Sequence, residues 1–181
     1  MNNTITLYHG TTHDFAAIDV TRGKPFKDFG KGFYATQSYE HAVSIAERNQ
    51  RIERERLNEV EIRRDVKIYV YSYSLQQSDL DKLNVKRFDS PDTNWVDFVV
   101  HNRSDSRARH DYDLVIGATA NDDTRITIQN YLLGNFGEPG SDSAVAIFLQ
   151  LIKAEKLPTQ WLFATQRATN LLKFEKRVQL L

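Results

Sequence analysis

The sequence predicts an α+β fold, because stretches with strand periodicity and stretches with helical periodicity follow one another without a regular βαβ alternation. Residues 4–10, TITLYHG, alternate and are rich in β-branched side chains, which predicts a first strand ending at Gly10. Residues 38–65 predict one long helix, which the Ser38 hydroxyl can cap. We expect residues 1–181 to form a single domain.

The helix predicted over residues 38–65 changes character along its length. Its apolar side comes from four residues, Ala42, Ile45, Ala46 and Ile52. Between Arg48 and Arg64 it consists mostly of Arg and Glu at helical spacing. Charges of mixed sign at this spacing are typical of a solvated face with weak ion pairs. A surface that binds a partner or RNA is the alternative that the pattern leaves open.

Residues 65–75, DVKIYVYSYSL, give the clearest strand signal in the chain. Alternation places Ile68, Val70 and Ser72 on one face and Tyr69, Tyr71 and Tyr73 on the other. We interpret the three tyrosines as one side of a half-buried sheet, and base stacking is the alternative.

The second half of the chain mixes short helices and strands. Residues 90–103 predict a helix that buries Trp95, Phe98 and Val99. Residues 120–124, ANDDT, form a turn cluster whose side chains can cap the next helix. The other predicted elements are a strand at 112–119, a helix at 125–134, a loop at 136–142, a helix at 143–157, a strand at 160–165, a helix at 166–174 and a strand at 177–181.

Composition excludes several classes of site. The 24 basic and 24 acidic residues cancel, which argues against binding of nucleic acid through phosphate neutralisation alone. The absence of cysteine excludes disulfides, thiolate metal sites and thiol nucleophiles. The first residues lack the basic and apolar regions of a secretory signal, and no apolar run is long enough to span a membrane. We therefore expect a cytoplasmic protein without a membrane partner.

Common catalytic motifs are also missing. The sequence has no Gly-x-Ser-x-Gly elbow for a serine nucleophile. His9 and His13 are four residues apart, but Gly10 between them breaks the helix that a metal-binding pair needs. Residues 29–33, FGKGF, lack the length and ending of a P-loop and the third glycine of a dinucleotide-binding loop.

What remains is a set of polar and glycine residues at strand ends. His9 and Gly10 end the first strand, Tyr34 follows the glycine turn of KDFGKGFYAT, and Gln160 begins a late strand. If residues 33 and 34 are extended, Phe33 and Tyr34 point to opposite faces. Each signal is weak alone, since a single histidine in a strand is most often structural.

In this order the residues resemble the ADP-ribosyltransferase superfamily, in its histidine–tyrosine–glutamate branch, which includes diphtheria toxin and the poly(ADP-ribose) polymerases. The chain is also similar to a bacterial group within that superfamily. Five stretches between Tyr8 and Phe174 carry the resemblance: YHGT, DFGKGFYAT, WVDFVVHNR, YDLVIGATAND and QWLFATQRATNLLKF. The resemblance implies a split two-sheet β core with surrounding helices, which holds NAD as co-substrate in a cleft.

The resemblance also implies roles for residues of the first two stretches. His9 is expected to hydrogen-bond a ribose hydroxyl of the adenosine half, and the backbone of Gly10 to bind the nicotinamide carboxamide. Tyr34 is expected to stack on the nicotinamide ring, so that one pocket joins its phenol and the His9 imidazole. Phe33 should fill the core. The full set expected to contact NAD is Tyr8, His9, Gly10, Thr11, Gly32, Phe33, Tyr34, Ala35 and Asp122.

The third catalytic position departs from the branch. Where relatives carry a glutamate that hydrogen-bonds the nicotinamide-ribose 2′-OH, this chain has Gln160. Glutamine keeps the hydrogen bond but brings no charge, so turnover should fall unless another carboxylate helps. Asp122 and Asp123 are candidates for that help, and capping of the next helix is their alternative role.

Two further departures concern target specificity. Pro158 stands two residues before Gln160, so the Glu/Gln-x-Glu signature of arginine-modifying relatives is absent. Ile45 stands where the toxin-like branch has a second stacking tyrosine, for which Tyr39 is a candidate substitute.

The resulting hypothesis is a mono-ADP-ribosyltransferase with His9, Tyr34 and Gln160 as catalytic residues and a protein or nucleic acid as acceptor. The resemblance implies a bacterial toxin of a toxin–antitoxin or phage-defence system, with a small antitoxin protein as a further partner. A catalytically weak or silent NAD-binding sensor of the same fold is the alternative. A third hypothesis makes the tyrosine strand and Arg51, Arg54 and Arg56 an RNA-docking surface.

Overall fold

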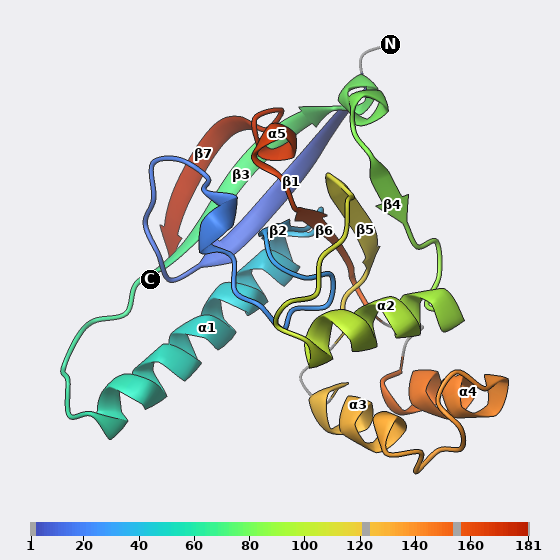
Figure 1. Cartoon of the computed structure of the whole chain (residues 1–181). Coiled ribbons are helices and arrows are strands. Elements are labelled where there is room, and N and C mark those ends of the chain that lie inside the picture. The colour runs from blue at the N-terminus through green and yellow to red at the C-terminus, as the bar shows by residue number, and fades with distance from the viewer. Residues whose placement is uncertain (1–2, 121–123, 154–156, 181) are drawn as a thin grey trace.

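Two β-sheets joined at a single bridge organise the chain in the computed structural model, which describes residues 3–120, 124–153 and 157–180 (Figure 1). The first sheet is antiparallel, with strands in the order β1 (Thr4–Thr11), β3 (Ile68–Gln76) and β7 (Lys173–Leu180). The second sheet has the order β2 (Phe33–Ala35), β6 (Thr159–Phe163), β5 (Leu114–Ala118) and β4 (Val85–Arg87). The prediction of an α+β fold is confirmed.

The two sheets touch through Tyr8 of β1 and Thr36, the residue after β2. The Tyr8 N–H donates to the Thr36 carbonyl at 2.7 Å, and the Thr36 N–H donates to the Tyr8 carbonyl at 2.9 Å. Beyond this pair the sheets diverge, and their facing surfaces enclose one hydrophobic core. It contains the ring side of β3, with Tyr69, Tyr71 and Tyr73 at most 8% exposed, together with Leu7, Phe33, Trp161 and Phe163.

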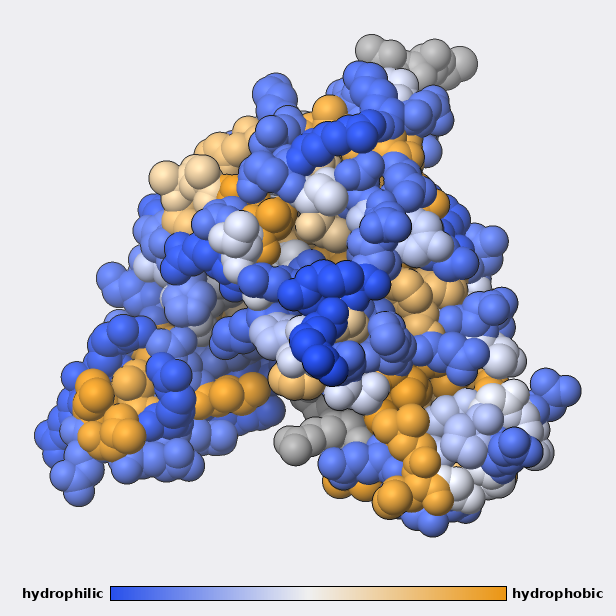
Figure 2. Space-filling model, viewed as in Figure 1, coloured by the Kyte–Doolittle hydropathy of each residue, from blue (hydrophilic) through white to orange (hydrophobic). Residues whose placement is uncertain are grey.

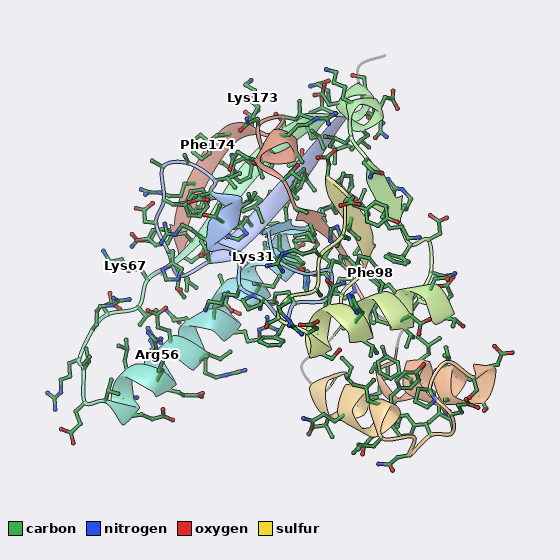
Figure 3. The ribbon with its side chains drawn as sticks, in the orientation of Figure 1. Lys31, Arg56, Lys67, Phe98, Lys173 and Phe174 are labelled. Atoms are coloured by element: carbon green, nitrogen blue, oxygen red, sulfur yellow. The ribbon has the colours of Figure 1, made fainter. Side chains whose placement is uncertain are left out.

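Burial of these rings confirms the expected sheet face and makes the base-stacking alternative wrong. The alternation of β3 puts the tyrosines toward the second sheet, where water and nucleic acid do not reach them. A second core lies on the opposite face of the second sheet, against α2 (Thr93–Ser104), α3 (Thr124–Leu132) and α4 (Asp142–Leu151). Within α2, Trp95 and Val99 are fully buried as expected. Phe98, labelled in Figure 3, is partly buried, and its ring centroid lies 5.3 Å from that of Phe88.

The first helix, α1 (Tyr39–Glu59), begins as predicted, because the Ser38 hydroxyl accepts a hydrogen bond from the His41 N–H at 3.0 Å. It ends six residues before the predicted Asp65. The chain turns there with Glu61 at φ 55° and the Ile62 N–H bonded to the Leu57 carbonyl at 2.9 Å, a common helix-ending geometry.

The prediction of the buried side of α1 is only partly correct. Ala42 and Ala46 are buried, but Ile52 is 54% exposed. Figure 1 shows the physical reason, because the outer half of α1 runs away from both sheets.

Two further helices are shorter than predicted. The helix predicted to 157 ends at Leu151, and Lys153 takes a left-handed conformation of φ 52°. The helix predicted over 166–174 is only α5 (Gln166–Thr169), because the chain enters β7 at Lys173 and pairs with β3. Tertiary pairing therefore overrides the local helical pattern.

The structure adds short elements that the sequence pattern does not distinguish. These are β4, the 3₁₀ turns η1 (Val20–Arg22) and η2 (Gln77–Lys82), and the extent of β2. Three-residue strands are too short for alternation to identify them. Within the described ranges, no helix combines the length and the apolar character needed to cross a bilayer.

Gly10 lets α1 pack against β1. A Cβ at this position would lie 1.8 Å from the Ala42 carbonyl oxygen and 3.1 Å from the Ala46 nitrogen. The backbone of the helix thus occupies the space that any other side chain at position 10 would need, and the small residues Ala42 and Ala46 allow this approach.

Gly10→Ala should therefore destabilise the fold. We expect the free energy of unfolding to fall by about 1–3 kcal/mol, the usual cost of overpacking, in urea titrations followed by circular dichroism. Thr6→Ala, an exposed change on the same strand, should leave the unfolding midpoint near that of the wild type. An unchanged midpoint for Gly10→Ala would show that α1 moves away at no cost.

Candidate active site

His9 of β1 is held by the backbone of β2. Its Nδ1 lies 2.7 Å from the Tyr34 carbonyl oxygen, and since a carbonyl can only accept, Nδ1 carries the proton. Nε2 is then the acceptor that this ring offers to another group. The ring packs at 4.5 Å on Phe33 and at 5.8 Å on Phe15, measured between centroids.

The His9 imidazole is neutral at pH 7. Burial lowers its pKa from 6.5 to about 4, the bond to the Tyr34 carbonyl opposes that shift, and the nearby His13 lowers the pKa further. A neutral ring with a fixed tautomer is suited to accept a hydrogen bond from a hydroxyl group.

Gly10 presents its backbone polar groups at an open strand edge. The N–H and C=O of Tyr8 point toward Thr36, so two residues later those of Gly10 point to the same side of β1. β2 has diverged at that point, and among the described residues no backbone partner from β2 reaches either group. Gly10 is itself buried, and buried backbone groups nearly always have a partner. This edge is therefore a place where a ligand can supply one donor and one acceptor.

Tyr34 lies on the other face of β2 from Phe33. Its hydroxyl donates to the Gly30 carbonyl at 2.7 Å and accepts from the Phe29 N–H at 3.1 Å. Burial, and to a smaller extent the negative charge of Asp28, raise the pKa of Tyr34 well above its usual value. The phenol and the imidazole of His9 thus lie on opposite faces of β2, joined by the Tyr34 carbonyl. The expectation that one pocket joins the two rings is therefore wrong, because alternation along β2 sends the side chains of Phe33 and Tyr34 to opposite faces and His9 packs on Phe33.

Gln160 of β6 shares the Tyr34 side of the second sheet, and its amide is bound to a buried carboxylate. Nε2 donates to Asp28 Oδ2 at 2.6 Å, and the same oxygen accepts the Ala120 N–H at 2.8 Å. The other oxygen, Oδ1, pairs with Arg103 through Nη2 at 2.5 Å and Nε at 2.6 Å. Asp28 is 4% exposed. This arrangement fixes the Gln160 amide, which leaves Oε1 as the atom that the side chain offers elsewhere.

Positive charge gathers around this carboxylate. Burial holds the pKa of Lys27 below its usual range, and the neighbouring charges of Arg48, Arg103 and Lys24 contribute, while Asp28 acts in the opposite direction. These cations come from the loop before β2, from α1 and from α2. Such a grouping suits the phosphates of an anionic ligand.

The other expected contact residues take varied positions. Tyr8 packs edge-on against Tyr39 at 5.4 Å, so the two tyrosines meet where β1 passes α1. Thr11 is buried and its hydroxyl accepts from the His13 N–H. Phe33 and Ala35 face the core between the sheets, as expected for Phe33. Asp122 and Asp123 lie outside the described residues.

The glycines of the second stretch serve packing. Gly30 has φ 93°, and a Cβ there would lie 2.8 Å from Asn102 Oδ1. A Cβ at Gly32 would lie 2.5 Å from the Phe163 carbonyl oxygen of β6. Contacts within the chain thus account for both glycines, including Gly32, which was expected to contact NAD.

Sequence reasoning missed Asp28 and Arg103. The available signal was a single carboxylate inside the glycine and aromatic stretch KDFGKGFYAT, and an arginine ending WVDFVVHNR.

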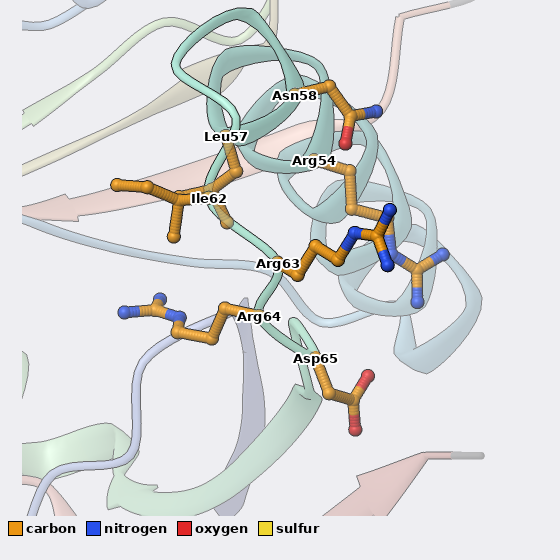
Figure 4. A pocket seen from close by; sticks show the side chains of 7 residues that line it. All are labelled: Arg54, Leu57, Asn58, Ile62, Arg63, Arg64 and Asp65. Carbon is orange, nitrogen blue, oxygen red and sulfur yellow. The ribbon is translucent and has the colours of Figure 1, made fainter.

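A hollow of about 410 Å³ lies outside the candidate active site, at the far end of α1 (Figure 4).

Comparison with known proteins gives one match. A family model described as "Protein of unknown function (DUF3990)" matches residues 5–174. No curated protein and no solved structure matches the chain.

The low pKa of His9 predicts a pH dependence of stability. The unfolded chain binds a proton at His9 below pH 6.5, whereas the folded chain does not until about pH 4. Stability contributed by the neutral ring is therefore complete above pH 6.5 and is lost as the pH falls toward 4. His9→Asn should flatten this part of the curve in urea unfolding at a series of pH values. Equal slopes for both proteins would contradict the assignment.

Gln160→Glu should destabilise the fold at neutral pH, because it places a second carboxylate against Asp28 Oδ2. We expect a loss of about 3–5 kcal/mol, as when a buried ion pair is disrupted. The deficit should shrink as the pH falls, since the introduced carboxyl group, once protonated, can again donate to Asp28. The double variant Asp28→Asn with Gln160→Glu exchanges donor and acceptor and should recover part of the loss. A deficit independent of pH would argue against this contact.

Proposed function

The chain belongs to the DUF3990 family, and from its candidate active site we propose that it is an NAD-dependent mono-ADP-ribosyltransferase with an ADP-ribosyltransferase-like fold. The observation that carries the proposal is the open edge of β1 at Gly10, beside the bridge where the two sheets diverge. A carboxamide needs one acceptor and one donor side by side, which are what the Gly10 C=O and N–H offer.

The residues on either side of this edge suit the two ends of NAD. His9 Nε2 accepts from a ribose hydroxyl of the adenosine half, because Nδ1 is committed to the Tyr34 carbonyl. Tyr34, whose hydroxyl is anchored by the loop at 29–30, offers its ring to the nicotinamide. The resemblance assigns the two rings to different halves of the dinucleotide, and we keep that assignment, which their positions on opposite faces of β2 allow. Lys24, Lys27 and Arg48 provide positive charge for the phosphates.

The reaction breaks the bond between nicotinamide and ribose C1′, and the electron pair leaves with the nicotinamide nitrogen. A nucleophile of the acceptor then bonds to C1′ and loses its proton. Gln160 Oε1 supports this step by accepting from the ribose 2′-OH, which eases the positive charge that develops on the sugar. Since Asp28 accepts from Nε2, it polarises the amide and makes Oε1 a stronger acceptor than an isolated glutamine.

The acceptor we propose is a macromolecule, protein or nucleic acid, and the role as a bacterial toxin with a small antitoxin stays a prediction. The alternative function is an NAD-binding sensor without turnover. It is favoured by one observation, that Gln160 carries no charge and spends its amide on Asp28.

Titration with NAD and assay of released nicotinamide test the proposal. Tyr34→Ala should weaken NAD binding roughly two- to tenfold, because an offset stack is worth about 0.5–1.5 kcal/mol, and should abolish release. Tyr34→Phe is the matched control, which keeps the ring and loses only the bonds to the loop at 29–30. His9→Ala should also abolish release. Release that is unaffected by Tyr34→Ala and His9→Ala would refute the assignment.

The exchange variant Asp28→Asn with Gln160→Glu separates enzyme from sensor. It supplies a carboxylate at position 160 and a donor at position 28 for that pair, while the Ala120 N–H loses its acceptor. A rise in nicotinamide release at unchanged NAD affinity would identify a weakened enzyme, whereas NAD binding without release in both proteins would identify a sensor.

A further inference from the structure

The outer half of α1 and the segment that returns to β3, residues 51–65, form a projection that we call the arm (Figure 1). Three large aliphatic side chains of the arm are more than half exposed: Ile52 at 54%, Val60 at 59% and Ile62 at 52%. Figure 2 shows the corresponding hydrophobic surface among charged side chains at this end of the molecule. Such grouping on a short projection is typical of an interaction surface.

A hollow of about 410 Å³ lies within the arm, between the last turns of α1 and the returning segment (Figure 4). Its lining is Arg54, Leu57, Asn58, Ile62, Arg63, Arg64 and Asp65. Arg64 is paired with Glu53 at 2.5 Å. Across the described part of the chain no ion pair includes Arg54 or Arg63, so two guanidinium groups border a partly apolar hollow and can pair with carboxylates of a partner.

The arm also carries the carboxylates that would complement this hollow. Glu55, Glu59 and Glu61 are exposed, and within the described ranges no ion pair includes them. The arm is neutral, with Arg51, Arg54, Arg56, Arg63 and Arg64 against Glu53, Glu55, Glu59, Glu61 and Asp65. These acidic groups repel a phosphate backbone, and the exposed aliphatic residues cannot stack bases. Nucleic acid is therefore the less suitable occupant.

We infer that the occupant is a second copy of this chain, docked arm to arm about a two-fold axis. In such an interface each residue that contacts a partner residue receives the reciprocal contact, so one surface must carry both charges. Arginines of one arm then meet glutamates of the other, and Ile52, Val60 and Ile62 are covered from both sides. The inference does not depend on the proposed reaction, because none of the residues assigned to NAD belongs to the arm.

Analytical ultracentrifugation of the full chain with charge-reversed arms tests this interface. The wild type should be a dimer at low ionic strength. Its association should weaken at about 1 M salt, where the Debye length falls to about 3 Å and the ion pairs between the arms are screened. The acidic arm variant, Arg54→Glu with Arg63→Glu, should raise the dissociation constant roughly a hundredfold, because like charges then face each other. The basic arm variant, Glu55→Arg with Glu59→Arg, should do the same. An equimolar mixture of the two variants should dimerise again.

Lys173→Glu with Lys176→Glu, an exposed double reversal on β7, is the matched control and should dimerise like the wild type. Figure 3 shows Lys173 on the far side of the molecule from Arg56 of the arm. Circular dichroism melts check that all variants are folded. A monomeric wild type overturns the inference. An equimolar mixture that stays monomeric also overturns it. So does a wild type that binds a single-stranded RNA oligonucleotide as a monomer and loses this affinity in the acidic arm variant.

Discussion

The carboxylate of Asp28 is the interaction on which the arrangement of the second sheet depends. It is buried, carries a charge and is bound by Arg103 of α2, by Gln160 of β6 and by the Ala120 N–H after β5. A buried charge of this kind is tolerated only when every lone pair is used, so the three elements must come to the loop at 27–30 together. That loop in turn binds the Tyr34 hydroxyl and fixes one face of β2. The position of β2 then sets where the sheets meet.

The single bridge between Tyr8 and Thr36 follows from the same constraint. Because β2 has only three residues and pairs with β6, the chain meets β1 at one position, Thr36, directly after the strand. The remaining edge of β1 keeps its backbone groups, and Gly10 stands there because α1 leaves no room for a side chain. One short strand thus produces both the divergence of the two sheets and the unpaired backbone edge of β1 at Gly10.

Local patterns predicted the parts of the fold that depend on neighbouring residues. The alternation of residues 65–75 indicated the correct buried face of β3, and Ser38 indicated the correct start of α1. Local patterns gave wrong predictions where contacts with residues distant in the sequence determine the structure. The stretch after Gln166 has a helical pattern, but pairing with β3 makes its end a strand. The helical spacing of Ile52 from Ala42 and Ala46 predicted that it would be buried. It is exposed, because the outer half of α1 runs away from both sheets.

In the candidate site, too, the sequence indicated individual residues but not the contacts between distant ones. The sequence indicated His9, Gly10, Tyr34 and Gln160 because each stands at a strand end or after a glycine turn. It could not indicate that Gln160 meets Asp28, since the two residues are 132 positions apart and neither stretch shows which residues of the other it contacts. Nor could it show that His9 and Tyr34 lie on opposite faces of β2.

The strand order also has a consequence for biosynthesis. β1 pairs with β3, β3 needs β7 on its other side, and β2 has its partner in β6. Neither sheet can close on the ribosome until the end of the chain, which carries β6 and β7, has been translated, and contacts of such sequence separation form slowly. During synthesis the nascent chain therefore lacks the folded edge of β1 at Gly10. This would delay any activity until the polypeptide is released.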